Sequence, residues 1–164
     1  MESKSWTWVG KSQWPRGEWD DEPDKMQWLD KDSGLPCLIL RGPSGALCGY
    51  VGVAPGHHNY EVEHDNAKDM DGGDLDAHGG LTFSRMCPPK DEVHVHDICH
   101  EADDDDRWWL GFDCAHLGDY SPKMDERYRV NDRDESYRNV KYVKEECRRL
   151  AAQLVFHVEQ KDST

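Results

Sequence analysis

Residues 37–53 read CLILRGPSGALCGYVGV, and this stretch decides the fold. It contains two apolar runs, residues 37–41 and 46–53, on either side of a Gly-Pro-Ser-Gly turn. Apolar runs of this length around a Gly/Pro turn are typical of an antiparallel β-hairpin. Gly49 and Gly52 leave one face of the second strand bare, which indicates a bulge or the close approach of a ligand or another backbone.

Further elements follow on the C-terminal side of this hairpin. Apolar or alternating runs predict three more strands, over residues 80–84, 93–101 and 108–113. A helix over about residues 137–159 is predicted by apolar residues at the three/four spacing of one helix face. This stripe consists of Val140, Val143, Cys147, Leu150, Ala151, Leu154 and Val158. We expect the stripe to pack against the sheet.

The expected fold class is α+β, with one antiparallel sheet packed by a long C-terminal helix. A length of 164 residues fits a single domain, and no internal repeat indicates a second one. Within it we distinguish a Trp-rich N-terminal segment (1–34), the sheet and loops (35–135) and the C-terminal helix (136–160). In the first segment, acidic residues before Pro23 are typical of a helix start and predict a short helix over about residues 21–29.

The net charge of the chain is −14, from 34 acidic and 20 basic residues. A negative field of this size repels phosphate backbones, so the composition argues against binding to long nucleic acid. A small anionic ligand is still compatible, because Arg41, Arg85 or backbone N–H groups can neutralise it locally. The seven Trp exceed what packing alone needs, and such rings also line ligand pockets and interfaces.

Membrane insertion and export are not expected. No apolar run approaches the length of a membrane span, and the first residues lack the apolar segment of a signal peptide. The six Cys show no dense disulfide spacing and no Cys-x-x-Cys pair, so we expect free thiols in a reducing compartment, the cytoplasm. They are Cys37, Cys48, Cys87, Cys99, Cys114 and Cys147.

Two polar stretches separate the predicted strands. Residues 54–77 are rich in Gly and Asp, and a loop of this length inside a domain is either functional or disordered. The acidic run 103–106 is interpreted as a solvated hairpin tip, because consecutive carboxylates repel one another and rarely converge on one ion without other ligands.

His78, Gly79 and Gly80 form the first candidate site, just before a predicted strand. Paired glycines permit positive φ angles and bring backbone N–H groups close to a ligand. A His at such a position can exchange a proton near neutral pH. Thr82 alternates with Leu81 and is expected to share the face of the site. The alternative interpretation is a tight turn with an exposed His.

Asp113, His116 and Asp119 form the second candidate site, at a spacing of three residues beyond a predicted strand. An Asp can orient a His tautomer and raise its basicity, and two carboxylates with a His can hold a divalent cation. Cys114 is a nucleophile only if its pKa is lowered, and the alternative is a small buried thiol beside a capped turn.

Four other His are further candidates. His94 and His96 point the same way if residues 93–101 form a strand, so they either chelate a metal together or cluster by chance on an exposed strand. His57 lies beside His58 in a Gly/Pro loop from which it could reach the site. No cofactor is expected. Binding of a divalent metal is still compatible with the sequence, but its ligands are unknown.

Two motifs, HGGLTFS at residues 78–84 and WWLGFDCAHLGD at residues 108–119, resemble those of a group of small uncharacterised proteins encoded by phages and prophages. Residues 49–57 and the helix around 142–154 are similar too, so the likeness covers most of residues 35–155. That group has no established activity, and the resemblance therefore implies a setting, the cytoplasm of a host cell. In this setting counter-defence roles are expected, such as degrading or sequestering a host nucleotide signal or blocking a host defence protein.

Three functional hypotheses follow. The first is phosphodiesterase-like hydrolysis of a small nucleotide-like phosphoester, a signalling nucleotide for example. His78 would be the general base and His116 the general acid, with Asp113 orienting His116. Backbone N–H groups of the paired glycines would stabilise the developing anion, and an Arg would neutralise the phosphate. The ligand-binding set is Gly79, Gly80, Thr82, His57, Asp119, Arg41 and Arg85.

The second hypothesis is a non-catalytic sponge that sequesters such a nucleotide with the same residues. The third is an acidic inhibitor of a host defence protein, which the net charge of −14 motivates. A homo-oligomer stays open in each case.

Overall fold

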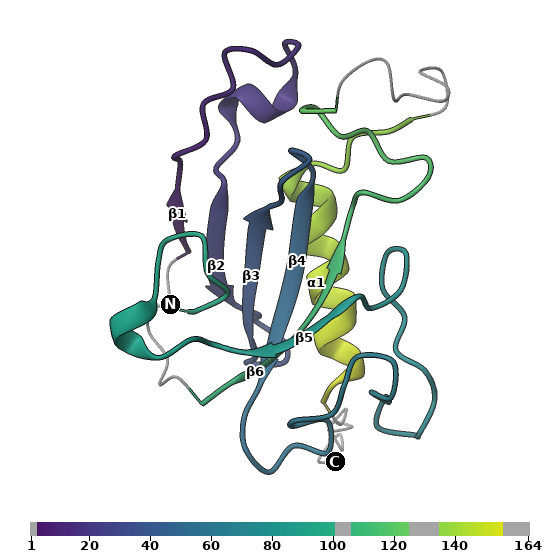
Figure 1. Cartoon of the computed structure of the whole chain (residues 1–164). Helices are drawn as coiled ribbons and strands as arrows, with labels where there is room; N and C mark the ends of the chain where they lie inside the picture. The colour runs from purple at the N-terminus through teal and green to yellow at the C-terminus, as the bar shows by residue number, and fades with distance from the viewer. Residues whose placement is uncertain (1–2, 101–105, 125–134, 156–164) are drawn as a thin grey trace, which may run out of the picture.

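The computed structural model describes residues 3–100, 106–124 and 135–155 of the chain (Figure 1). In these ranges six strands form one antiparallel sheet and one α-helix packs on it, which confirms the α+β class. The strands are β1 (Lys4–Trp6), β2 (Lys25–Leu29), β3 (Pro36–Arg41), β4 (Leu47–Val53), β5 (Phe83–Met86) and β6 (Trp108–Asp113). The α-helix is α1 (Val140–Gln153), and two short 3-10 helices are η1 (Glu18–Asp21) and η2 (Lys90–Glu92).

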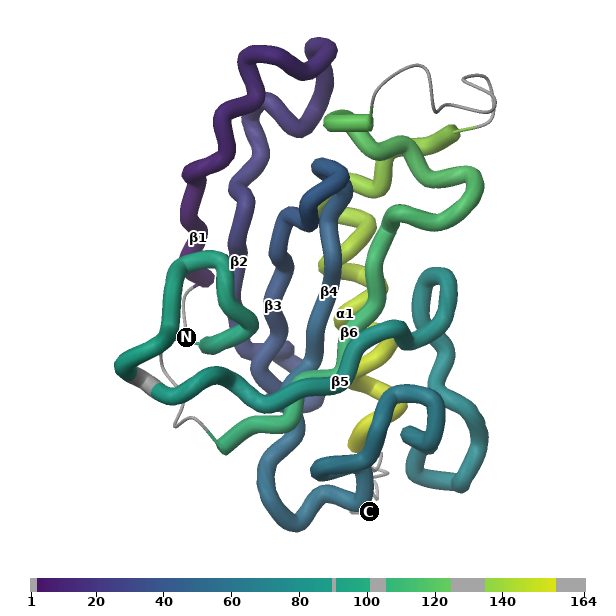
Figure 2. Tube along the Cα trace, viewed as in Figure 1, coloured from purple at the N-terminus to yellow at the C-terminus, as the bar shows by residue number. Residues whose placement is uncertain are grey.

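The strands lie in the order β1-β2-β3-β4-β6-β5, and neighbouring strands are antiparallel (Figure 2). The predicted hairpin is confirmed, because β3 pairs with β4 across the turn, with Cys37 opposite Val51. β4 also pairs with β6, a strand that follows only after a long excursion of the chain. The N–H group of Thr82 donates to the Gly111 carbonyl at 2.9 Å, which places the His-Gly-Gly motif near the C-terminal end of β6.

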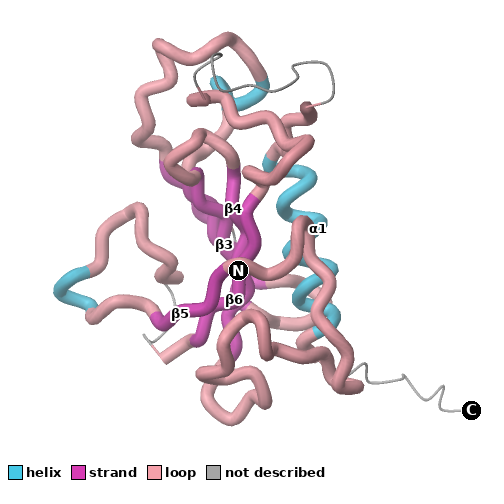
Figure 3. Tube along the Cα trace, turned by 45° about the vertical axis from the view of Figure 1, so that its right-hand side comes forward, coloured by secondary structure: helices cyan, strands magenta, loops and turns pink. Residues whose placement is uncertain are grey.

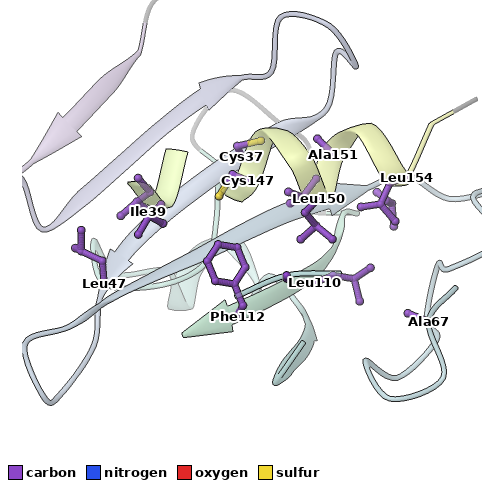
Figure 4. Packing of buried hydrophobic residues seen from close by; sticks show 14 of the residues in the cluster. Cys37, Ile39, Leu47, Ala67, Leu110, Phe112, Cys147, Leu150, Ala151 and Leu154 are labelled. Carbon is purple, nitrogen blue, oxygen red and sulfur yellow. The ribbon is translucent and has the colours of Figure 1, made fainter. Parts of the chain in front are cut away.

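α1 covers one side of the sheet, and the segment around η2 lies on the other (Figure 3). The helical stripe predicted from the sequence faces the sheet, because Val143, Cys147 and Leu150 are completely buried. This arrangement is the expected burial of one amphipathic face against a sheet. The side chains that the stripe joins in one core come from β3, β4 and β6 and include Cys37, Ile39, Leu47, Leu110 and Phe112 (Figure 4).

Gly49 lets the helix and β6 pack closely around β4. A Cβ atom at this position would lie 2.4 Å from Phe112 Cζ and 2.8 Å from Cys147 Sγ, so a side chain would force these groups apart. Gly52 faces the opposite side, where a Cβ atom would lie 3.1 Å from the Trp109 ring. The two glycines therefore do not bare one face of the strand, because residues three apart in a strand point to opposite faces.

The segment 93–100 is not a strand, so this part of the predicted sheet is wrong. It continues from η2 as irregular chain, and a disulfide between Cys87 and Cys99 closes it into a loop. The expectation of free thiols is therefore wrong for this pair. Burial of Ile98 in a cluster with Trp109, on the sheet face away from α1, holds the loop in place without strand pairing.

The N-terminal segment also differs from its prediction, because residues 25–29 form β2 and not a helix. A helical turn does form among the acidic residues, but it is η1, which ends before Pro23. A strand is favoured at residues 25–29 because β3 offers a free edge there, and each β2 residue finds a partner on it. Met26 and Trp28 alternate with their neighbours and pack against the core under α1.

Arg41, a predicted ligand residue, is instead buried and forms hydrogen bonds and an ion pair within the fold. Its Nε donates to Asp24 Oδ1 at 2.7 Å, and both side chains are completely buried. Its Nη1 donates to the Gly45 carbonyl and to Tyr137 Oη at 2.9 Å each. Although burial opposes ionisation, hydrogen bonds from Lys11, Arg41 and two backbone N–H groups lower the pKa of Asp24. This ion pair ties the N-terminal segment to the β3–β4 turn.

Two predicted features extend beyond the residues that the structure describes. Residues 156–159 of the predicted helix and residues 103–105 of the acidic run lie outside the described residues.

Gly49→Ala is expected to destabilise the fold by about 1–3 kcal/mol, because an extra methyl group in a close-packed core forces its neighbours out of place. Gly10→Ala is the matched control, since a Cβ atom at Gly10 meets nothing within 4 Å. Urea denaturation should give a lower midpoint for Gly49→Ala and a change of no more than about 0.5 kcal/mol for Gly10→Ala. Equal stability of the two variants would contradict the contact of Phe112 and Cys147 at Gly49.

Candidate functional site

The His-Gly-Gly motif forms a tight turn just before β5. Gly79 and Gly80 have φ angles of 68° and 81°, which only glycine adopts readily. The N–H group of Gly80 donates to the Ala77 carbonyl at 2.8 Å and closes the turn. The motif is therefore a tight turn, and this turn holds His78 in a fixed place with its side chain only 14% exposed.

The segment after β6 is joined to the start of α1. Asp119 forms an isolated parallel bridge with Ser136. Around it, the N–H group of Tyr120 donates to the Ser136 carbonyl, and the N–H group of Ser136 donates to the Gly118 carbonyl, both at 2.8 Å. α1 begins just beyond, where the Asn139 side chain caps the helix by accepting from the Tyr142 N–H group. Arg138 and Tyr142, on either side of this cap, thereby reach the site.

The carboxylate of Asp119 is the centre of the site. It accepts hydrogen bonds from His78 Nε2 at 2.8 Å, from Arg138 Nε at 2.9 Å and from the N–H group of His116 at 3.1 Å. Its side chain is only 2% exposed. Burial alone would raise the pKa of Asp119, but these three hydrogen bonds outweigh burial and hold the pKa below its ordinary value. Asp119 is therefore a carboxylate at neutral pH.

His78 is bonded at both ring nitrogens. Nδ1 lies 2.7 Å from Tyr142 Oη, on the side of the ring away from Asp119. Because the Asp119 carboxylate only accepts, Nε2 carries a proton, and in the neutral ring Nδ1 then accepts from the Tyr142 hydroxyl. Asp119, His78 and Tyr142 thus form a hydrogen-bonded chain. The Arg138 guanidinium lies 4.9 Å from the centre of the Tyr142 ring and adds a cation–π contact.

His116 stands beside His78. The centres of the two imidazole rings are 6.2 Å apart. Gly79 makes this approach possible, because a Cβ atom there would lie 2.3 Å from His116 Cδ2. His116 Nε2 is 3.3 Å from Asp113 Oδ1, and among the described residues this buried nitrogen has no hydrogen-bond partner. The Asp113 carboxylate also accepts from Thr82 Oγ1 at 3.0 Å.

The other predicted ligand residues make their contacts elsewhere. Arg41 is buried in its ion pair, and its guanidinium bonds to other parts of the fold. His57 Nε2 lies 2.6 Å from the Leu154 carbonyl, at the C-terminal end of α1. Arg85 is exposed on β5 opposite Trp109, and the hydrogen bonds of His78 within the described residues go to Tyr142 and Asp119 instead.

Two residues of the site, Arg138 and Tyr142, were not found from the sequence. They stand four residues apart, with Arg138 just before the helix cap Asn139 and Tyr142 in the first turn of α1. That spacing alone did not distinguish them from a solvated face, since no part of the sequence shows that Ser136 pairs with Asp119.

The remaining sequence candidates show no site geometry. Burial and, next, the charge of Asp119 raise the pKa of the Cys114 thiol well above its ordinary value, so it is the small buried thiol of the second interpretation. His94 and His96 are exposed and their rings stack with centres 5.3 Å apart. Among the described residues, no group of three or more His, Cys, Asp or Glu side chains is placed to hold a metal ion.

Comparisons with protein-family models, with curated proteins and with solved structures gave no match to this chain. The likeness to phage and prophage proteins therefore stays an expectation from the sequence. Over the part of the chain that the structure describes, no helix is both long enough and apolar enough to cross a membrane.

Asp119→Asn is expected to lower the free energy of unfolding by about 1–3 kcal/mol at neutral pH, because three donors lose a charged acceptor. The pKa of Asp119 is lower in the folded protein than its ordinary value of 3.8. The ionised carboxylate therefore stabilises the folded state fully above pH 3.8, and this stabilisation is lost as the pH falls through the folded-state pKa. The gap between wild type and variant, measured by urea denaturation, should therefore narrow below about pH 4. The exposed Asp65→Asn variant is the control, and a gap of the same size at pH 7 and pH 3 would refute this role of Asp119.

Proposed function

We propose that the protein hydrolyses a small nucleotide-like phosphoester at the site formed by His78, His116, Arg138 and Tyr142. The observation that carries the proposal is the placement of His78. It is bonded to a buried carboxylate on one side and to a hydroxyl on the other, with a second imidazole 6.2 Å away. Pairs of titratable groups in such proximity are typical of acid–base sites.

Arg138 is the cation that fits the phosphate, in place of Arg41 or Arg85. Its Nε is bonded to Asp119, while in the described part of the chain its terminal nitrogens make no hydrogen bond or ion pair. Its side chain is 30% exposed, so a ligand can reach it. A guanidinium of this kind binds phosphate oxygens through paired N–H groups. The Gly80 N–H group is used within the turn, so the N–H group of Gly79 is the glycine donor that we assign to the ligand.

The acid–base step follows from the hydrogen-bonded chain. A water molecule attacks phosphorus and passes a proton to Tyr142 Oη, while the hydroxyl proton of Tyr142 moves to His78 Nδ1. His78 becomes an imidazolium, and the ionised Asp119 stabilises it. The bond from phosphorus to the leaving oxygen breaks, and that oxygen takes a proton from His116, the general acid, whose Nε2 lies 3.3 Å from Asp113 Oδ1. Proton exchange with water then restores the starting state.

A non-catalytic sponge for the same class of ligand is the second candidate. The observation that favours it is that both nitrogens of His78 are already bonded, so His78 meets a substrate only through Tyr142. Arg138 and His116 would then provide affinity without chemistry. In either case the counter-defence setting rests on the resemblance to phage proteins. The third hypothesis, an acidic inhibitor of a host defence protein, does not use this site.

The test is incubation of the purified protein with a panel of cyclic and linear nucleotides, followed by chromatography of the products. His78→Ala should lower the rate by on the order of a hundredfold to ten-thousandfold, and Tyr142→Phe should lower it by a similar factor because the proton path is cut. His94→Ala is the matched control, since its exposed imidazole belongs to the segment around η2, on the side of the sheet away from α1, and the variant should keep the wild-type rate.

The outcomes separate the hypotheses. If the wild-type protein binds a nucleotide but forms no product, and if Arg138→Gln loses this binding, the protein is a sponge and not a hydrolase. Full activity in both His78→Ala and Tyr142→Phe, with melting temperatures equal to wild type, would show that the site is wrong.

A further inference from the structure

A groove lies between β2 and the exposed side of α1. It has a volume of about 780 Å³, and its lining includes Met26, Trp28, Val140, Lys31, Lys141 and Lys144. A second hollow of about 560 Å³ shares Trp28, Lys31 and Lys144 with it and continues the groove past the indole. β2 lies beyond β3 in the sheet, whereas the His78 site lies beyond β4, beside β6. The groove is therefore separate from that site.

The charge of the groove is opposite to that of the chain. The chain carries a net charge of −14, yet four cations and two carboxylates line the groove. One cation, Arg148, pairs with Glu145 at 2.9 Å. The other three are Lys31, Lys141 and Lys144, and none of them pairs with a carboxylate in residues 3–100, 106–124 and 135–155.

Trp28 gives the groove an apolar wall. Its indole is half-buried, and Lys144 Nζ lies 5.3 Å from the centre of the ring. The half-buried side chains of Met26 and Val140 extend this wall. A concave, largely apolar surface with a few charged groups, in a volume of several hundred Å³, is the usual form of a small-molecule site.

We infer that this groove binds an amphipathic organic anion, a small molecule with a flat apolar body and at least one negative group. The apolar body stacks on Trp28, and the negative group is held by the unpaired lysines. A long polyanion or a large acidic partner fits less well, because the chain as a whole carries a net charge of −14 and repels it. This site is independent of the proposed hydrolysis.

The test uses 8-anilinonaphthalene-1-sulfonate as the anionic probe and neutral N-phenyl-1-naphthylamine as its uncharged counterpart. We expect saturable one-site binding of the sulfonate to the full chain and weaker binding of the neutral compound. In a ¹H–¹⁵N spectrum the sulfonate should shift the indole signal of Trp28, which a Trp28→Phe variant assigns, and leave that of the buried Trp109 in place.

The triple variant Lys31→Gln, Lys141→Gln and Lys144→Gln should raise the dissociation constant of the sulfonate by roughly tenfold, since exposed charge contacts are individually weak. The control removes the same charge from exposed cations outside the groove, with Arg16→Gln, Arg85→Gln and Lys123→Gln. An equal loss in the control, equal binding of the neutral compound, or an unshifted Trp28 signal would overturn the proposal. The melting temperature of each triple variant is measured first. A variant that melts at the wild-type temperature is folded under the assay conditions, so its dye binding is not due to unfolded chain.

Discussion

The packing of α1 on the face of β3 and β4 is the interaction on which the rest of the structure depends. The helix covers one face of the sheet, and Val143, Cys147 and Leu150 are buried there without any exposed surface. The approach is close because Gly49 carries no side chain. The helix start is fixed as well, since the Val140 N–H group donates to Glu22 Oε2 at 2.7 Å. The helix therefore has one position along the sheet, and every residue at its N-terminal end has a defined place.

The candidate site follows from that position. Tyr142 reaches His78 only because α1 begins beside the loop after β6, and Arg138 reaches Asp119 for the same reason. A carboxylate as buried as that of Asp119 needs several donors, and it obtains them from three separate segments of the chain. The same hydrogen bonds that satisfy this buried charge also hold both imidazoles near each other. Stability and the proposed chemistry thus share one group of contacts, so a change at Asp119 affects both.

The sequence predicted the elements whose patterns are local and missed those that depend on distant partners. The hairpin of β3 and β4, the strand β6 and the helix were found because apolar spacing reports burial directly. β2 was mistaken for a helix, because acidic residues before Pro23 are typical of a helix start while the free edge of β3 is invisible in the sequence. Residues 93–100 alternate like a strand but are held by a disulfide. In the site, His78, His116 and Asp119 were predicted from their motifs, while Arg138 and Tyr142 enter through tertiary pairing alone.

The most direct test of the account is a titration of the His78 and His116 ring signals with adenosine monophosphate, followed by ¹⁵N nuclear magnetic resonance. If the two imidazoles and Arg138 form one phosphoester site, both rings shift along one binding curve with a single dissociation constant. Arg138→Gln then weakens that constant for both rings together. Rings that do not respond, or that follow two different binding curves, would contradict the central claim.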